Sequence, residues 1–344
     1  MKIRIGSRGS ALALAQTNGV ARALSDLGHD TEVVIVETAG DRDQDRRFSE
    51  IGAPGVFVRE IEAALLDAKI DLAVHSYKDL PSRSPEGLVV AALPERLDPR
   101  DCLIMRTAGR PVGRGDQGAT PRAEGTEPGA REPGPGVPGT ELGLDLPLQE
   151  NAIVGTASER RRALVQSLRP DLRIEPIRGN VPTRLAKLRE GPYDAIVLAV
   201  AGLMRLEGRQ DAADLGLDSL VRMPLDPAVF VPAPAQGAIA LQCRGHDRVV
   251  AAVAPLHDAD AAAPVRAERE LLRLVDGGCD LPFGAWCRRL DGGDLELLSV
   301  IESDGFLVRQ GGQGGSPEEL AARVWAQLAD KLCATPADGA GVEA

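Results

Sequence analysis

The stretch KIRIGSRGSALA, residues 2–13, decides the fold class. Its first residues predict a short strand, and Ser10 is a typical N-cap for a helix that we expect to end at Gly28. The same order of elements continues along the chain. We expect further strands at residues 32–37, 70–74 and 88–93, with a helix near residues 57–68. Strands that alternate with helices predict a mainly parallel sheet that is covered by helices.

A second α/β series begins after residue 150. We expect strands at residues 152–155, 172–177, 194–199 and 237–243, helices at 158–168, 183–189 and 265–275, and strand-like segments at 295–301 and 306–310 before a closing helix. We therefore predict three domains. The first is an α/β domain of residues 1–99 and 229–246, the second an α/β domain of residues 100–222, and the third a small α+β domain of residues 251–335.

A glycine- and proline-rich stretch interrupts the second domain. Residues 109–139 hold nine glycines and six prolines and no aromatic residue. Such a composition cannot bury enough apolar surface to become ordered. We expect a disordered insertion that covers about residues 109–147. We favour a tolerated surface insertion over an arm that docks a partner.

Composition excludes several classes of protein. The 344 residues carry a formal net charge of −11 and only 3% aromatic side chains, so nucleic acid is not an expected partner. We find neither a long apolar run nor a signal-like N-terminus, so we expect a cytoplasmic protein without membrane contact. The five widely spaced cysteines form no CxxC pair, which argues against a disulfide framework or a zinc site.

Two helix starts carry residues that suit an anion. Arg8 and Ser10 lie in the loop that precedes the first expected helix. The loop at residues 155–162 is similar, and its candidate residues are Thr156, Ser158, Arg160 and Arg161. Arginines in a first helical turn oppose the helix dipole, so we interpret them as ligands of an external anion. The alternative is an ordinary cap with solvated arginines.

Further arginines follow the ends of expected strands. They are Arg178, Arg184 and Arg205. Ligands of open α/β sheets bind at the carboxyl ends of the strands, so this pattern favours a site for a polyanion. The alternative is a set of surface arginines that pair with Asp and Glu.

Lys78 and Asp79 follow the buried strand at residues 70–74. Asp79 is a candidate acid, base or cation stabiliser, with an ordinary turn or salt-bridge aspartate as the alternative. We interpret the adjacent His75 as a core histidine.

Cys279 follows two glycines after the helix near residues 265–275, which suggests an exposed loop thiol available for covalent chemistry. We interpret Cys102, Cys243 and Cys287 as buried apolar residues and assign no role to Cys333.

Taken together, these motifs resemble the porphobilinogen deaminase family, also called hydroxymethylbilane synthases, over roughly residues 3–328 apart from the insertion. The motifs are SRGSALA at residues 7–13, VHSYKDLP at 74–81, DPRD at 98–101, GTASERR at 155–161, IRGNV at 177–181, AVAGL at 199–203, PAQGA at 234–238 and GGC at 277–279.

The resemblance implies two similar α/β domains like those of type-II periplasmic binding proteins, plus a small α+β C-terminal domain. It implies a transferase of haem and tetrapyrrole biosynthesis that condenses four porphobilinogen molecules head to tail, releases ammonia and forms a linear tetrapyrrole. It also implies a dipyrromethane cofactor on Cys279 through a thioether, no metal, and a monomer.

The resemblance also implies roles for individual residues. Asp79 is the expected catalytic residue, which stabilises the positive charge left on the substrate when ammonia departs. The expected cofactor-binding residues are Cys279, Ser10, Lys78, Asp79, Thr156, Ser158, Arg160, Arg161 and Arg178. The expected substrate-binding residues are Arg8, Arg184 and Arg205.

Two other classes of protein compete with this hypothesis. A two-domain solute-binding protein would share the paired α/β domains and an anion site. A cysteine hydrolase would use Cys279 as nucleophile and His75 as base, although no motif supplies the third, orienting group.

Overall fold

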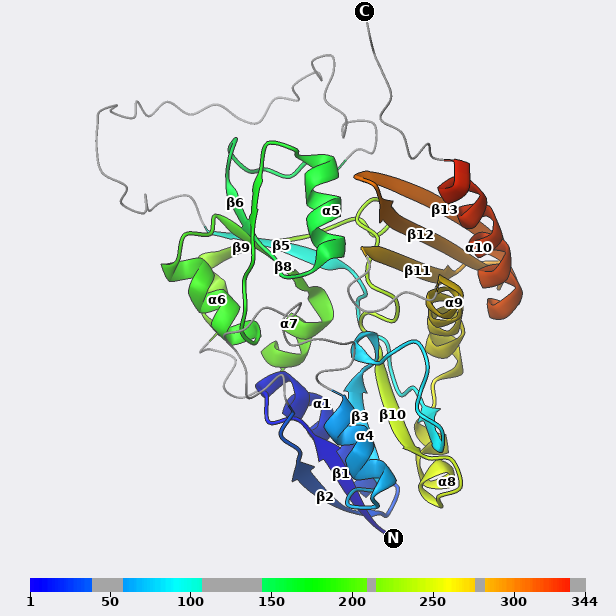
Figure 1. The fold of residues 1–344 in the computed structure, drawn as a ribbon. Helices are drawn as coiled ribbons and strands as arrows, with labels where there is room; N and C mark the ends of the chain where they lie inside the picture. Colours follow the sequence, from blue (N-terminus) through cyan, green and yellow to red (C-terminus); the bar gives the residue numbers. More distant parts are fainter. Residues whose placement is uncertain (39–57, 107–143, 209–214, 276–281, 335–344) are drawn as a thin grey trace, which may run out of the picture.

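The structure is a computed structural model that describes residues 1–38, 58–106, 144–208, 215–275 and 282–334. Its strands form two five-stranded sheets and one three-stranded sheet in the described part of the chain (Figure 1). The predicted α/β class with a smaller α+β unit is confirmed.

The first sheet has the order β2-β1-β3-β10-β4. Its strands are β1 (Lys2–Ser7), β2 (Asp30–Ile35), β3 (Leu72–Ser76), β4 (Leu88–Ala92) and β10 (Ile239–Arg244). Strand β1 pairs in parallel with β2 and β3, whereas β10 lies antiparallel between β3 and β4. The expectation of a mainly parallel sheet missed this insertion, because β10 comes from a segment far along the chain.

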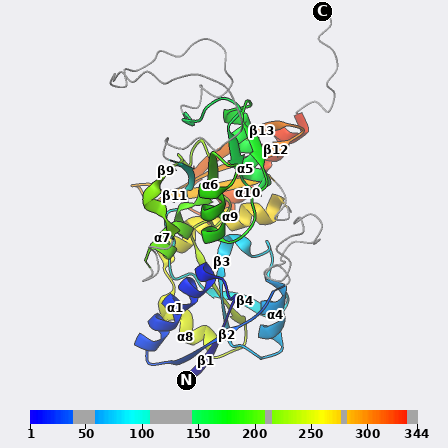
Figure 2. The ribbon, with the colours of Figure 1, turned by 90° about the vertical axis from the view of Figure 1, so that its left-hand side faces the viewer.

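Helices cover both faces of the first sheet (Figure 2). Helix α1 (Ala11–Asp26) packs on β3, and α8 (Val249–Val253) packs on β10 and β4; both belong to one core cluster with Leu72 and Val74 of β3. Helix α4 (Arg59–Leu66) packs on Ala73, the residue between them. Successive side chains of a strand point to opposite faces, so β3 is buried on both sides.

The second sheet repeats this plan with the order β7-β6-β8-β5-β9. Its strands are β5 (Asp101–Arg106), β6 (Ile153–Gly155), β7 (Arg173–Glu175), β8 (Ala195–Ala199) and β9 (Leu220–Pro224), and its helices are α5 (Glu159–Leu168), α6 (Val181–Glu190) and α7 (Val200–Glu207). Strand β6 pairs in parallel with β7 and β8, and β5 pairs antiparallel with β8 and β9.

Two crossing segments join the sheets, namely residues 93–100 before β5 and residues 225–238 before β10. They contact each other: Arg96 forms an isolated antiparallel bridge with Ala238, and the Leu97 N–H donates to the Gly237 carbonyl at 3.1 Å. The crossing segments therefore form a paired connection beside the strand ends of both sheets.

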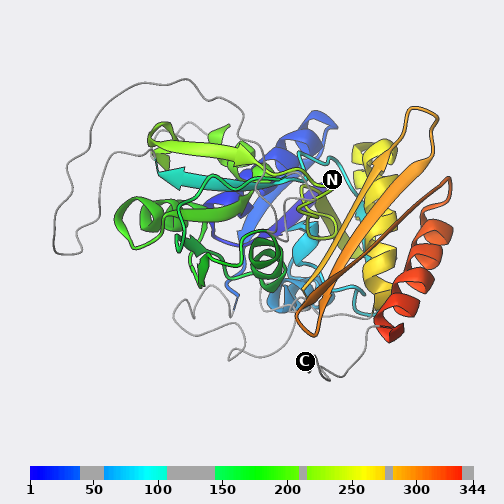
Figure 3. The same ribbon diagram turned by 90° about the horizontal axis from the view of Figure 1, so that it is seen from above.

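The third unit is an antiparallel sheet of β11 (Phe283–Arg289), β12 (Leu295–Ser303) and β13 (Phe306–Gly314). Helices α9 (Ala259–Val275) and α10 (Pro317–Ala334) lie side by side against it (Figure 3). The sequence analysis missed β11.

The expected insertion ends earlier than residue 147. Residues 109–143 of it lie outside the described residues, but Leu146 is 1% exposed and belongs to the core of the second sheet. The Leu146 carbonyl also accepts a hydrogen bond from Arg169 at 2.9 Å. The prediction for residues 144–147 was wrong because Leu144, Leu146 and Leu148 supply apolar surface that the preceding segment lacks.

None of the helices in the described ranges is long and apolar enough to span a membrane.

Candidate functional site

A buried group of one carboxylate and two arginines lies where β5 meets the first turn of α5. Arg160 Nη1 donates to Asp101 Oδ2 at 2.8 Å, and Arg161 Nη2 donates to Asp101 Oδ1 at 2.7 Å. The Asp101 side chain is 0% exposed, and the arginine side chains are 5% and 7% exposed. Burial opposes ionisation of Asp101, yet the two guanidinium groups hold its pKa well below the ordinary value.

This group changes the interpretation of the helix start. We expected Arg160 and Arg161 to await an external anion, but Asp101 is an internal one. Further donors of the two guanidinium groups bind the carbonyls of Val231 and Val197 at 2.8 and 2.9 Å. The sequence did not identify Asp101 as their partner, because a residue so distant in sequence cannot be recognised from local pattern. Their contact with a cofactor stays a prediction.

Lys78 joins the first sheet to this group. It lies in the short 3₁₀ helix η1 (Tyr77–Asp79) directly after β3. Its Nζ donates to Gln236 Oε1 at 3.1 Å, and Gln236 Nε2 donates to Asp101 Oδ1 at 3.0 Å. Burial lowers the pKa of Lys78 to about 8, and the nearby positive charge of Arg161 acts in the same direction.

Arg178 and Arg184 bring positive charge from the loop before α6 and from its first turn. Arg184 Nε donates to the Gly179 carbonyl at 2.8 Å. Gly179 has a φ of +106°, and a Cβ there would meet Thr183 at 2.6 Å, so only glycine fits. Burial lowers the pKa of Arg184 to about 10, and the charges of Arg161 and Arg178 add to the effect.

Five cationic side chains thus lie within electrostatic range of one another, and we call them the cationic cluster. They are Lys78, Arg160, Arg161, Arg178 and Arg184. Asp101 is buried among them, whereas Asp79 is exposed and its charge acts on both Lys78 and Arg184. The structure therefore brings together Asp79 and five of the basic residues that the sequence singled out.

The predicted hydroxyl residues cap helices. Ser10 Oγ accepts from Ala13 N at 3.3 Å, and Ser158 Oγ accepts from Arg161 N at 3.4 Å. Thr156 Oγ1 accepts from Ser158 N at 3.2 Å. Ser10 and Ser158 are therefore helix N-caps, and Thr156 holds the turn that precedes α5. Because each oxygen acts as an acceptor there, its O–H hydrogen can still donate to a ligand.

Arg205 is held apart from the cationic cluster. Its Nη2 donates to Glu95 Oε1 at 2.9 Å and to the Gly237 carbonyl at 2.8 Å. These contacts tie the last turn of α7 to both crossing segments. Arg8 is half-buried in the loop between β1 and α1.

The cysteines divide as predicted where the structure describes them. Cys102, Cys243 and Cys287 are buried. Burial raises the pKa of Cys102 and of Cys243 to about 11, and it raises the pKa of Cys287 further, so these thiols are unreactive. Cys333 is exposed. Cys279 lies outside the described residues.

His75 is a core residue, as predicted. Its Nε2 lies 3.1 Å from Gln242 Oε1, and burial lowers its pKa to about 4. The imidazole is therefore neutral near pH 7 and already occupied by a glutamine. Nothing in this environment favours the role of a hydrolase base.

Sequence reasoning assigned no role to Asp101 or Gln236, although both lie in motifs that it recognised, DPRD and PAQGA. The two motifs were the signal in the sequence from which a role for these residues could have been predicted.

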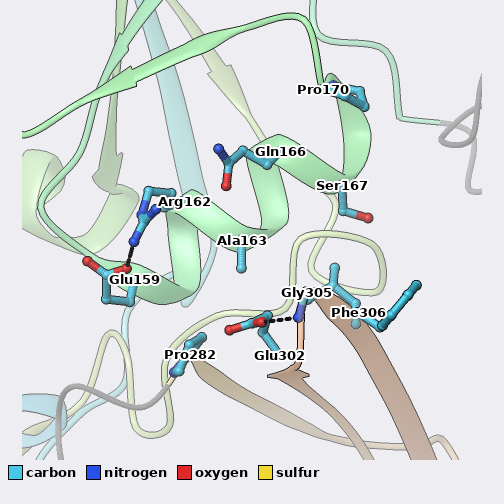
Figure 4. Close-up of a pocket in the computed structure, with 11 residues that line it drawn as sticks. Glu159, Arg162, Ala163, Gln166, Ser167, Pro170, Pro282, Glu302, Gly305 and Phe306 are labelled. Carbon is cyan, nitrogen blue, oxygen red and sulfur yellow. Dashed lines mark hydrogen bonds and ion pairs between the residues drawn. The ribbon is translucent and has the colours of Figure 1, made fainter. Parts of the chain in front are cut away.

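A pocket of about 520 Å³ lies on another face of α5 (Figure 4). It is lined by Arg162, Ala163 and Gln166 of α5 and by Phe306 of β13, among others. None of the predicted site residues lines it, because α5 turns Arg160 and Arg161 toward the core instead.

The fold and the site define a class: an α/β protein of two similar sheets, with a cluster of desolvated cations suited to a polyanionic ligand. The family model "Porphobilinogen deaminase, dipyromethane cofactor binding domain" matches residues 3–120 and 143–252. The chain belongs to the porphobilinogen deaminase family.

Similar proteins agree with this assignment. The porphobilinogen deaminase of Syntrophobacter fumaroxidans is 41% identical over 321 residues, which cover 92% of this chain and 90% of that protein. The porphobilinogen deaminase of Bacillus cereus is 38% identical, covering 93% of this chain and 91% of the relative. The porphobilinogen deaminase of Phenylobacterium zucineum is 40% identical, covering 89% and 85%.

Among solved structures, the high-specificity arginine periplasmic binding protein STM4351 of Salmonella typhimurium aligns with 78% of this chain and 97% of its own, at 11% identity and a TM-score of 0.35. A probable amino-acid ABC transporter binding protein of Bacillus subtilis aligns with 74% and 90%, at 9% identity and a TM-score of 0.36. Likenesses this distant carry no functional argument.

Proposed function

We propose that this chain is a transferase of tetrapyrrole biosynthesis that condenses four porphobilinogen molecules head to tail, with release of ammonia, to give hydroxymethylbilane. Membership of the porphobilinogen deaminase family carries the proposal, since the matching relatives span about nine-tenths of the chain. The cationic cluster supports it, because every pyrrole unit of the substrate bears two carboxylates.

The residues present fit a dipyrromethane cofactor. Its four carboxylates need fixed cations, and the cationic cluster offers five positive side chains against the carboxylates of Asp79 and Asp101. Burial lowers the pKa of both Lys78 and Arg184, which means that the fold holds their charges at a cost in desolvation. In a chain with a net charge of −11, such a group suits an anionic ligand.

The bound cofactor supplies the terminal pyrrole ring to which the first substrate is joined. Lys78, Arg178 and the hydroxyls of Ser10, Thr156 and Ser158 bind carboxylates. Arg160 and Arg161 present their remaining N–H groups in an orientation set by Asp101. Cys279 holds the group covalently through a thioether.

Asp79 acts on the substrate. Loss of ammonia leaves positive charge on the pyrrole ring, and an exposed carboxylate beside Lys78 and Arg184 stabilises that charge through the ring N–H. The same carboxylate accepts the proton that leaves the ring carbon when the new bond forms. Arg8, Arg184 and Arg205 bind the carboxylates of the incoming substrate.

The intact mass of the purified protein tests this function. We expect an adduct of two pyrrole units that gives a pyrrole colour reaction and is absent from Cys279→Ser. Cys333→Ser removes another cysteine, an exposed one on α10, and keeps the adduct. A wild-type mass equal to that of the bare polypeptide contradicts the proposal and favours a reversible solute-binding protein.

We further propose a cytoplasmic monomer whose partner is porphobilinogen, and which binds neither nucleic acid nor membrane. The acidic composition supports this proposal, and sedimentation of the purified chain tests the monomer.

A further inference from the structure

The turn Ala235–Gly237 is held in a conformation that L-residues rarely adopt. Ala235 has a φ of +61°, and Gly237 has a φ of +90°. A Cβ on Gly237 would meet the Leu97 carbonyl at 2.3 Å. A left-handed alanine is strained, and the surrounding structure has to offset that strain.

The two residues of a buried ion pair both form hydrogen bonds with the backbone of this turn. Glu268 of α9 binds Arg96 at 2.8 Å, and their side chains are 0% and 8% exposed. Glu268 Oε2 accepts from Ala235 N at 2.7 Å, and Arg96 Nε donates to the Gln236 carbonyl at 3.2 Å. The backbone on both sides of the Gln236 side chain is therefore immobilised by groups outside the cationic cluster.

The Gln236 side chain uses both ends of its amide. The residue is 0% exposed. Oε1 accepts from Lys78 Nζ at 3.1 Å, while Nε2 donates to Asp101 Oδ1 at 3.0 Å and to the Pro99 carbonyl at 2.8 Å. Only one orientation of the amide satisfies all three partners, because an ammonium needs an acceptor and a carboxylate needs a donor.

We propose that Gln236 is a positioning residue: its side-chain amide holds the Lys78 ammonium in place beside the buried Asp101–arginine group, where it can bind a ligand carboxylate. The held turn fixes the backbone from which the amide extends, and three hydrogen bonds orient the amide itself. This inference rests on the proposed function, since it concerns how Lys78 serves the site.

The hydrogen bond between Gln236 and Lys78 affects the pKa of Lys78. Burial and the positive charges of Arg161 and Arg160 lower the pKa of Lys78 to about 8, although the negative charges of Asp79 and Asp101 act in the opposite direction. A hydrogen bond from a charged group contributes about 1.5–3 kcal/mol, or about one to two pKa units. Loss of the Gln236 acceptor therefore lowers the pKa of Lys78 further and discharges it near neutral pH.

The test measures Lys78 directly by its pH-dependent acetylation with acetic anhydride, quantified by peptide mass spectrometry. Lys69, whose side chain is 72% exposed, is the internal reference. We expect a midpoint near pH 8 in the wild type. Gln236→Met lowers this midpoint by about one unit, and Gln236→Glu raises it, because a carboxylate stabilises the ammonium.

Gln242→Met is the matched control. Gln242 is also 0% exposed, but its amide contacts Glu62 and His75 rather than Lys78. We expect Gln242→Met to leave the Lys78 midpoint unchanged. A general loss of stability would shift the Lys78 midpoint of both Gln236 variants in the same direction. Opposite shifts therefore identify a positioning role for Gln236. Equal midpoints in wild type, Gln236→Met and Gln236→Glu overturn the proposal.

Enzyme kinetics provide a second measure of the charge on Lys78. The pH profile of kcat/KM for Gln236→Met shifts to lower pH, where Lys78 regains its charge, and Gln236→Glu restores the profile at higher pH. The intact mass of each sample is recorded as well. A wild type without adduct refutes the proposed function, whereas an adduct together with unmoved Lys78 midpoints refutes only the role of Gln236.

Discussion

Asp101 and Arg161 form a buried ion pair at 2.7 Å between the start of β5 and the first turn of α5. Arg160 binds the other oxygen of the same carboxylate. The negative charge of Asp101 therefore offsets two basic residues that would otherwise oppose the dipole of α5. The pair also explains how two successive arginines in the first turn of α5 can be buried in an acidic protein.

Asp101→Asn is expected to destabilise the protein by about 3–5 kcal/mol, because it leaves two buried guanidinium groups without their carboxylate. Urea unfolding measures this loss. Glu159→Gln breaks the neighbouring pair with Arg162, in which both side chains are 49% exposed, and should cost less than about 1 kcal/mol. Equal costs for the two variants would contradict the buried-pair interpretation.

The stability of the wild type should fall as the pH drops below 3.8, the ordinary pKa of Asp101. Its pKa is lowered in the folded state, so its stabilising contribution is complete above the unfolded value and is lost as the pH falls toward the folded value. Unfolding curves from pH 5 to pH 2 measure this slope. Asp101→Asn should have a shallower slope, and an unchanged slope would assign the acid sensitivity to other groups.

Asp79→Asn should keep the covalent adduct and lose about two to four orders of magnitude in kcat, because the amide carries no charge to stabilise the substrate cation or accept its proton. Intact mass and steady-state kinetics separate the two effects. Asp67→Asn changes an acid that is 57% exposed on the same sheet unit and should leave kcat unchanged. A wild-type rate in Asp79→Asn would exclude the catalytic assignment.

The kcat/KM for porphobilinogen should fall between pH 7 and pH 9, because Lys78, which binds a cofactor carboxylate, loses its charge as the pH passes its pKa of about 8. The charged fraction falls about tenfold over this interval. Lys78→Arg keeps its charge throughout and should flatten the dependence, whereas Lys69→Arg should not. The same fall in Lys78→Arg would assign the titration to another group.

Glu95→Gln should lower the KM for porphobilinogen about two- to fivefold, because a neutral amide holds the Arg205 guanidinium less tightly and leaves it available to a substrate carboxylate. Steady-state kinetics at low ionic strength measure this change. An increase in KM would show instead that the pair with Glu95 serves to position α7.

Deletion of residues 109–139 should leave kcat, KM and the melting temperature close to those of the wild type, because this composition has too little apolar surface to contribute to the core. Leu146→Ala is the contrasting variant, with an expected loss of about 2–5 kcal/mol at a side chain that is 1% exposed. An inactive or unstable deletion variant would assign the segment a role in the fold or the reaction.

Local signals in the sequence account for much of the fold. The cap at Ser10, a helix starting near residue 158 and the paired strand–helix order were all predicted and are present. These features depend on residues only a few positions apart, so their physical causes are visible in the sequence. The β11 strand was missed because residues 283–289 show no clear alternation of apolar and charged side chains.

The sequence by itself determined that this is an α/β protein of the porphobilinogen deaminase type, with arginines near strand ends and an acidic surface. Only the tertiary structure decided which charges meet. Arg160 binds Asp101, which lies 59 residues away in the sequence, and Gln236 binds Asp101 from 135 residues away. Capping and periodicity act over a few residues, whereas these pairings depend on where two crossing segments return to the sheets, and no local rule specifies that.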